Sequence, residues 1–383
     1  MIKKNIAISL PCTGEDEWLA IKDPIVSGWL TQGVKVNEFE NEFAKKHGVK
    51  HALATTSCTT GLHLILVAMG IGPGDEVIVP AFTWVATANV VLYCGATPVF
   101  ADIDPKTNNI YPSEILKKIT DQTKAVIVVH LFGLCADMRS IRKYLPSHIK
   151  IIEDAACAAG ASYHGVSAGG LGDAAAFSFH PRKSITTGEG GMITTNDTYL
   201  AEKMVKLRNH GAEVSEEQRH LGPKPYLLPD FNLLGFNYRM TDLQGAIGLV
   251  QLQKLERYVK ERRYWADYYS KQLKDVEWIG IPEVPDGIVH AWQAYVLYIY
   301  SEKSPLTRNE IMEVLQSKGI STRPGTHAVH MLNYYAERFG LASQDYPNAK
   351  LCNDNTMAIP LHNRMEADDY QYVIDVIKGL KYL

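Results

Sequence analysis

The stretch GDEVIVPAFTWVATANVVLYCGATPVFADID, residues 74–104, contains the unit that decides the fold. It reads as a strand (76–80), a helical segment (84–95) that ends in glycine, and a second strand (97–104). The first strand is a short run of valine and isoleucine, which is typical of a strand buried on both faces of a mostly parallel sheet. A strand, a helix and a strand in this order indicate an α/β protein.

The same alternation extends outward from this unit, over about residues 50 to 210. Further strands are predicted at 51–55, 125–133, 149–156, 174–179 and 192–195, and helices at 60–70, 112–119 and 137–144. A long charged helix is predicted over 242–274, followed by a mixture of strand (294–300) and helix (308–319 and 367–380). We therefore expect a large domain with a mostly parallel mixed sheet over residues 1–250. A smaller α+β domain is expected over 251–383.

Length and composition narrow the class of protein. The chain has 383 residues, of which 46% are hydrophobic, so it is long enough for about two domains with substantial cores. With 39 basic and 42 acidic residues, the formal charge of -3 gives no indication of nucleic acid or an anionic membrane as a partner.

The cysteines and the apolar runs indicate a compartment. The six cysteines are scattered without a CxxC pair, which favours reduced thiols over a disulfide framework or a zinc site. No apolar run approaches the length of a membrane span, and the one near the start is too short for a signal peptide. A cytoplasmic protein is expected.

Ligands of an open parallel sheet gather at the carboxyl ends of its strands, so the loops that follow the strands are candidate sites. After the strand at 51–55, the segment TSCTTG (56–61) opens a helix with small hydroxyl residues. Such a start can bind phosphate, or it can simply carry an N-cap at Ser57 or Thr59. Trp84 follows the strand at 76–80, where it is either a core residue or one wall of a flat aromatic pocket.

Two charged residues complete the set. Asp154 lies near the end of the strand at 149–156. A buried carboxylate there is costly without a cationic partner, unless it serves as a helix N-cap. Lys183 lies in the polar loop of FSFHPRKSITTGEGG (177–191), and a lysine in such a loop is either a surface charge or an amine that attacks a carbonyl. A phosphate cradle, an aromatic wall, a buried aspartate and an amine are together the parts that hold pyridoxal 5'-phosphate (PLP).

Over nearly its whole length the chain resembles the DegT/DnrJ/EryC1/StrS family of PLP-dependent sugar aminotransferases, which have the aspartate-aminotransferase fold (fold type I). The matching stretches are SGWLTQGVKVNEFENEFA (27–44), residues 74–104 quoted above, IIEDAACAAGA (151–161), GDAAAFSFHPRKSITTGEGGMITTND (172–197), LRNHG (207–211) and LGFNYRMTDLQGAIGLVQLQKL (234–255).

The resemblance implies a role for each matching position. Lys183 would be the Schiff-base lysine, Asp154 the partner of the pyridine nitrogen, and Trp84 the residue that stacks on the ring. The phosphate would be bound by Thr59, Thr60 and Ser178, and by Asn237 from the neighbouring subunit of a homodimer, with Arg239 as a further candidate.

Three positions bear on the reaction. The family commonly has glycine where this chain has Cys58, and glutamine or histidine where it has Cys157, a position implied to contact the ring hydroxyl. A thiol is a weak hydrogen-bonding partner, so the cofactor's electronics or the substrate fit are expected to differ here. A dehydratase branch of the family replaces the lysine with histidine, so Lys183 favours amino transfer.

The expected reaction is a transamination from an amino acid, L-glutamate, to a nucleotide-linked keto-sugar. Lys183, with a depressed pKa, would carry the proton. Amination at C4 is favoured over C3, in the biosynthesis of surface polysaccharide or glycan. The alternatives are the same reaction on a cyclitol or a small phosphorylated ketone, and a PLP-binding regulator without turnover.

Arg323 and His327 are candidate acceptor contacts. The spacing of His327 and His330 is seen in metal sites, but without a third ligand no metal is expected. The glycines of GGLGD (169–173) predict a tight turn rather than a dinucleotide site.

Overall fold

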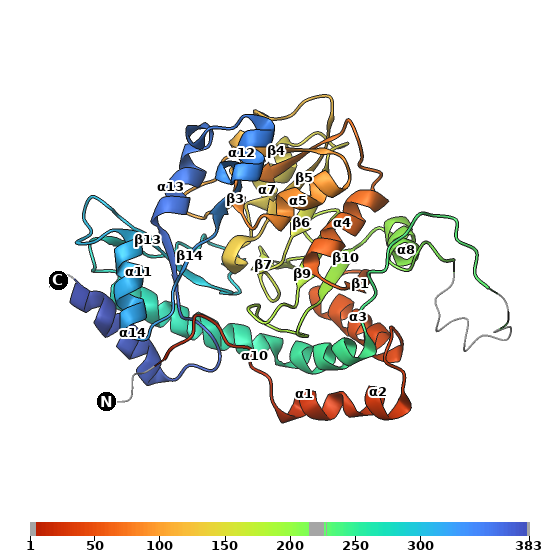
Figure 1. The fold of residues 1–383 in the computed structure, drawn as a ribbon, viewed down its shortest axis with the longest axis horizontal. Coiled ribbons are helices and arrows are strands. Elements are labelled where there is room, and N and C mark those ends of the chain that lie inside the picture. The colour runs from red at the N-terminus through yellow and green to blue at the C-terminus, as the bar shows by residue number, and fades with distance from the viewer. Residues whose placement is uncertain (1–4, 214–225, 227, 381–383) are drawn as a thin grey trace.

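The computed structural model describes residues 5–213, 226 and 228–380. Its centre is a seven-stranded sheet with the order β1-β10-β9-β6-β5-β2-β4 (Figure 1). The strands are β1 (His51–Thr55), β2 (Glu76–Pro80), β4 (Thr97–Ala101), β5 (Thr123–Val129), β6 (Lys150–Asp154), β9 (Ala174–Ser178) and β10 (Gly191–Thr195). Each lies where a strand was predicted, so the α/β expectation is confirmed.

The sheet is mixed and mostly parallel, as expected. Strands β4, β2, β5, β6 and β9 pair in parallel, whereas β10 runs antiparallel to both β9 and β1. The antiparallel pair is possible because the loop after β9 returns directly to β10 instead of crossing over through a helix. This loop carries Lys183.

Both faces of the sheet are buried, as shown by where successive strand residues point. Val77 and Val79 of β2 belong to one core cluster, and Ile78 between them belongs to another. Helices cover the first face with α4 (Cys58–Ala68), α5 (Ala86–Tyr93) and α8 (Thr198–Leu207), and the second with α3 (Val34–His47), α6 (Pro112–Leu116) and α7 (Met138–Tyr144). The valine-rich runs are explained by this double burial.

A second, smaller sheet with the order β11-β13-β16-β14 forms the C-terminal part. Its strands are β11 (Ile279–Gly280), β13 (Tyr295–Ile299), β14 (Arg323–Pro324) and β16 (Thr356–Ile359). Strands β11, β13 and β16 pack with α11 (Arg308–Ser317) and α14 (Ala367–Gly379) around a third core cluster. Ile6, near the start of the chain, also belongs to this cluster and pairs with Ile320.

The long helix α10 (Asp242–Leu273) runs beneath the large sheet to the C-terminal part (Figure 1). It contributes Leu252 and Leu255 to a core cluster of the large sheet, and Tyr269 and Leu273 to the third cluster. The predicted division between residues 250 and 251 falls inside this helix, and it stays a prediction.

The remaining elements are short. They are α1 (Glu15–Ala20), α2 (Lys22–Ser27), α12 (Asn333–Phe339), α13 (Pro347–Asn355), β3 (Phe82–Thr83), β7 (Ser162–Tyr163), β8 (Val166–Ser167), β12 (Ile288–Val289) and β15 (His327–Ala328), with 3₁₀ turns at Leu131–Gly133, Val329–Met331 and Ser343–Asp345. Across the described residues, no helix has the length and apolar character needed to cross a membrane.

A carboxylate of α10 caps another helix. Gly33 precedes α3 and has no side chain to cap it, and Asp242 takes over this function. Its carboxylate accepts hydrogen bonds from the amides of Gly33 (2.8 Å), Val36 (3.0 Å) and Lys35 (3.2 Å). The start of α3 is thereby fixed to the start of α10.

We expect Asp242→Ala to lower the free energy of unfolding by about 2 kcal/mol or more, because it leaves three amide groups without their charged acceptor. The shift in the urea midpoint measures this. Glu38→Ala on the same helix removes only a half-exposed pair with Lys35 and is expected to change the stability by less than about 0.5 kcal/mol. Equal effects of the two substitutions would contradict the capping role.

Candidate active site

The predicted site residues come from segments that end at one edge of the large sheet. Asp154 is the last residue of β6 and Ser178 the last of β9, and these strands are parallel neighbours. The start of α4 follows β1 and reaches the same edge. There Cys58 Sγ lies 3.3 Å from the carbonyl oxygen of Ala176 and 3.8 Å from Asp154 Oδ1.

Lys183 is held in place by its loop between β9 and β10. Its amide donates to the carbonyl oxygen of His180 (2.9 Å), which makes a tight turn. At the base of the loop, Thr186 donates from its amide to Gln251 Oε1 (3.2 Å) and from its hydroxyl to the Phe179 carbonyl oxygen (2.7 Å). Gln293 binds the carbonyl oxygen of Arg182 (3.0 Å). The lysine therefore sits on an anchored loop rather than on free surface.

The amine of Lys183 contacts a thiol. Nζ donates to Cys157 Sγ at 3.1 Å, and both side chains are half-buried. Burial acts to lower the pKa of Lys183, but Cys157, Cys58 and Asp154 outweigh it, so the pKa is raised above its ordinary value. The predicted depressed pKa is thus wrong for this set of side chains, since the neighbouring groups together favour the protonated form of the amine.

Asp154 is buried, and its hydrogen bonds come from neutral groups. Thr87 of α5 donates its hydroxyl to Oδ2 (2.8 Å), and the amide of Ala156 donates to Oδ1 (3.2 Å). Thr87 also shares a hydrogen bond with Thr83 (3.0 Å). In the part of the chain that the structure describes, no ion pair involves Asp154. A buried carboxylate held in this way is suited to a protonated nitrogen of a ligand.

The start of α4 can approach the sheet because position 191 is glycine. A Cβ atom there would lie 2.4 Å from the carbonyl carbon of Ser57, closer than atoms can pack. Gly191 pairs with Ser178 on one side and with Thr55 on the other, so Ser178 is brought next to the helix start. Amides at the start of an α-helix lack partners within the helix and attract anions.

Ser57 is the N-cap of α4, one of the two caps considered from the sequence. Its hydroxyl accepts from the amide of Thr60 (3.1 Å), and the Thr60 hydroxyl in turn accepts from the amide of Ser57 (3.0 Å) and donates to its carbonyl oxygen (2.8 Å). The Thr60 side chain is thus engaged in the cap. Thr59 beside it is half-buried, as Thr60 is. Phosphate binding by Thr59, Thr60 and Ser178 stays a prediction.

Trp84 and His327 meet across a short strand pair. β15 pairs with β3, and the two rings lie 5.6 Å apart. Trp84 is 62% exposed, so it is not a core residue and its ring is available for stacking. Arg323 is exposed on β14, in the segment that leads to His327.

The two histidines of this segment do not converge. His327 is exposed, whereas His330 is buried and its Nε2 lies 3.2 Å from the carbonyl oxygen of Ser343. Among the described residues, no group of three or more His, Cys, Asp or Glu side chains could hold a metal ion.

The GGLGD segment forms the predicted turn, which encloses Glu153. The Glu153 carboxylate accepts from the amides of Gly172 (2.6 Å), Gly169 (2.7 Å) and Leu171 (2.8 Å), and it lies 2.9 Å from His130 Nε2. Adjacent carboxylates therefore have different surroundings. The Glu153 carboxylate is used within the fold, where backbone amides donate hydrogen bonds to it. The Asp154 carboxylate is the one available to a ligand.

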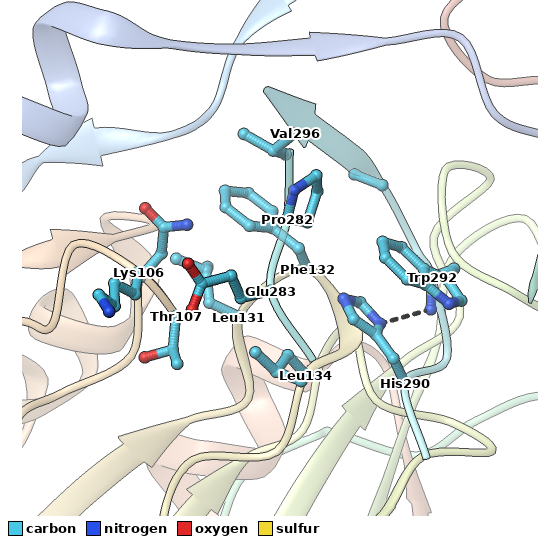
Figure 2. A pocket seen from close by; sticks show the side chains of 12 residues that line it. Lys106, Thr107, Leu131, Phe132, Leu134, Pro282, Glu283, His290, Trp292 and Val296 are labelled. Atoms are coloured by element: carbon cyan, nitrogen blue, oxygen red, sulfur yellow. Dashed lines mark hydrogen bonds between the residues drawn. The ribbon is translucent and has the colours of Figure 1, made fainter. Parts of the chain in front are cut away.

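A small pocket outside this cluster is shown in Figure 2, lined by residues of 106–108, 131–134 and 282–296. None of the predicted site residues lines it. The rings of His290 and Trp292 stack at 3.9 Å, and His290 Nδ1 accepts from the Trp292 amide (2.8 Å; dashed in Figure 2). The loop of Phe132 continues to Gly133, where a Cβ would lie 3.0 Å from the carbonyl oxygen of Cys157. Gly133, the residue that follows Phe132, therefore packs closely against the backbone of Cys157.

Asn237, predicted to act across a dimer interface, is exposed. It pairs with Asn209, and the carbonyl oxygen of the next residue, Tyr238, accepts from the amide of Thr56 (3.1 Å). Arg239 donates to Asn209 Oδ1 (2.7 Å) within the chain.

The residues present fit PLP: an anchored amine, a buried carboxylate that forms no ion pair with the described residues, a helix start near Ser178, and an exposed indole. Comparison with known proteins agrees, because the model of the DegT/DnrJ/EryC1/StrS aminotransferase family matches residues 11–378. The chain belongs to this family. It is a PLP-dependent aminotransferase of fold type I, as the resemblance implied.

Individual members are similar over the full length. The chain is 40% identical to the spore coat polysaccharide biosynthesis protein SpsC of Bacillus subtilis (strain 168) over 382 residues, covering 99% of this chain and 98% of that protein. It is 40% identical to the GDP-perosamine synthase of Caulobacter vibrioides over 373 residues, covering 97% and 96%. The PLP form of Spr1654 from Streptococcus pneumoniae superposes with a TM-score of 0.91 at 26% identity, covering 99% of each chain.

The sequence did not reveal every residue of the site. Thr87 was missed, although it lies on the helix predicted at 84–95, four positions after Thr83, whose hydroxyl it contacts. That its hydroxyl binds Asp154, 67 positions away, follows only from the packing of α5 against the sheet.

Proposed function

We propose that this aminotransferase moves an amino group from L-glutamate to C4 of a nucleotide-linked keto-sugar, in the biosynthesis of surface polysaccharide or glycan. The observation that carries the proposal is the combination of a lysine at position 183 with 40% identity to a GDP-perosamine synthase over nearly the whole chain. The similar identity to a spore coat polysaccharide biosynthesis protein supports the same class of product.

In this proposal the reaction depends on PLP and on Lys183, Asp154 and Thr87. PLP supplies the reactive aldehyde and an electron sink for the bonds around the substrate's reacting carbon. Lys183 holds the cofactor covalently and, once freed, moves the proton at that carbon. Asp154 keeps the ring nitrogen protonated, and Thr87 orients Asp154.

The other side chains bind and orient. Thr59, Thr60 and Ser178 hold the phosphate at the start of α4. Trp84 stacks on the ring, with His327 beside it toward the acceptor. Arg323, from the same segment as His327, provides a cation for an anionic acceptor.

We further propose that the enzyme works as a homodimer with shared sites. Asn237 would then reach the phosphate bound by the neighbouring subunit. Large apolar side chains are exposed near the start of the chain and near Asn237, and burial in an interface would stabilise them. They are Trp18, Leu19, Ile25, Val26, Phe231 and Leu234. The six cysteines are all free, which supports a reducing compartment such as the cytoplasm.

An acceptor panel tests the reaction. The purified enzyme is incubated with glutamate and, separately, with 4-keto and 3-keto nucleotide sugars, a keto-cyclitol and a small phosphorylated ketone. Release of 2-oxoglutarate with the 4-keto nucleotide sugar alone is the expected result. Turnover of only the cyclitol or the phosphorylated ketone would replace the nucleotide sugar as substrate, and no turnover with any acceptor would contradict all of these acceptor classes.

A further inference from the structure

The amine of Lys183 contacts a sulfur atom. Lys183 Nζ lies 3.1 Å from Cys157 Sγ, and neither side chain is fully buried. A nitrogen and a sulfur at this separation need to move by little more than an ångström to bond. Glutamine or histidine, common at this position in the family, could form no such bond with Lys183.

We propose that Cys157 and Lys183 form a reversible sulfur–nitrogen bond when hydrogen peroxide oxidises the enzyme while Lys183 is free of the cofactor. The bond inactivates the enzyme, because the Lys183 nitrogen that holds PLP is then bonded to sulfur. Cys157 is thus a modification site whose function is to make the enzyme sensitive to peroxide.

The chemistry balances in two steps. The Cys157 thiolate attacks one oxygen of hydrogen peroxide, gives a sulfenic acid and releases hydroxide, which takes a proton from the Lys183 ammonium to form water. The neutral amine then attacks the sulfenic sulfur, the S–O bond breaks, and a second water leaves with the remaining proton. Sulfur is oxidised and peroxide reduced. Two equivalents of a small thiol reverse the bond, giving back the thiol and the amine with one disulfide.

The surroundings favour the second step. The Lys183 amine lies 3.1 Å from Cys157 Sγ, so it is in place to attack the sulfur once that is oxidised. Burial acts to lower the pKa of Lys183, and Cys157 contributes most to raising it. Oxidation to the neutral sulfenic acid removes this contribution to the raised pKa of Lys183, which favours the neutral, nucleophilic form of the amine.

Four of the other five cysteines, namely Cys58, Cys94, Cys135 and Cys352, are less suited to this reaction. Cys58, Cys135 and Cys352 are buried. Burial also raises the pKa of Cys94 to about 11 and that of Cys352 to about 12, which keeps these thiols protonated. Cys58 is the competitor to exclude, because it lies near Asp154 in the same site and a disulfide with Cys157 would also remove two hydrogens.

The test uses the full-length enzyme loaded with pyridoxamine phosphate, which leaves Lys183 free, and the same enzyme loaded with PLP, which occupies it. Each is treated with hydrogen peroxide, and its mass is measured before and after a thiol reductant. We expect the pyridoxamine form to lose about 2 Da, two hydrogens, reversibly, and its digest to contain one peptide pair joined through Cys157 and Lys183. The PLP form is expected to keep Lys183 unlinked.

Variants distinguish the bond from its alternatives. Cys58→Ala is expected to form it as the wild type does. In Lys183→Met the reaction should stop at the sulfenic acid, a gain of about 16 Da that dimedone traps. Loss of two hydrogens in Lys183→Met, a peptide pair joined through Cys58, or no change in the mass of the wild type would each overturn the proposal. None of these readouts depends on the acceptor, so a wrong substrate assignment would leave them unaffected.

Discussion

Replacing Lys183 with alanine is expected to lower the rate of amino transfer by about 10⁴-fold, the upper end of what one positioned proton-transfer group contributes. The loss should be this large because the same nitrogen holds the cofactor and moves the proton. Arginine at this position keeps the charge but cannot form the bond, so Lys183→Arg is expected to be as inactive as the alanine variant. Single-turnover rates with glutamate measure the effect.

Two observations separate the loss of this amine from a damaged fold. Arg182→Ala, in the same loop, removes only an exposed side chain, because the backbone carbonyl of residue 182 keeps its hydrogen bond to Gln293. This variant should retain most of the activity. A small primary amine such as ethylamine, added to Lys183→Ala, should restore part of the rate because it can occupy the vacated space. A Lys183→Ala enzyme that works at the wild-type rate without added amine would disprove the assigned role.

The architecture was predictable because its signals are local. Strands such as 76–80 are continuous apolar runs, and the double burial of Val77, Ile78 and Val79 on alternating faces accounts for them. The antiparallel placement of β10 was not predicted, since no sequence pattern distinguishes a strand that returns beside its predecessor from one that crosses over.

The candidate site was predictable only as a set of residue types. Its contacts join positions far apart in the chain: Cys157 with Lys183, Cys58 with Asp154, and Asp242 with the start of α3. Such pairs depend on how loops close over the sheet, and this is a property of the whole packing. The pKa of Lys183 was mispredicted for the same reason. A depressed pKa was expected, whereas the contacts that outweigh the effect of burial follow only from the packing.

The second large effect is expected from Asp154→Asn. The substitution keeps the size of the side chain but removes the negative charge that would keep the cofactor's ring nitrogen protonated. Loss of one such electrostatic partner typically costs about 10²–10³-fold in kcat, and we expect a value in this range. The asparagine amide must also face either the Thr87 hydroxyl or the Ala156 amide, both of which donate to the carboxylate in the wild type.

Thr87 supplies a graded comparison for this loss. Thr87→Val keeps the charge of Asp154 but removes its hydroxyl partner at 2.8 Å, so a fall of about tenfold is expected, the value of one hydrogen bond to a charged group. Thr87→Ser restores the hydroxyl and should recover most of that loss. Rates in the order wild type, Thr87→Val, Asp154→Asn, together with a shifted absorbance of the bound cofactor in Asp154→Asn alone, would assign the charge to the ring nitrogen. An Asp154→Asn enzyme as fast as Thr87→Val would contradict the role of the charge. The loss in both variants would then be explained by the hydrogen bond between Thr87 and position 154 alone.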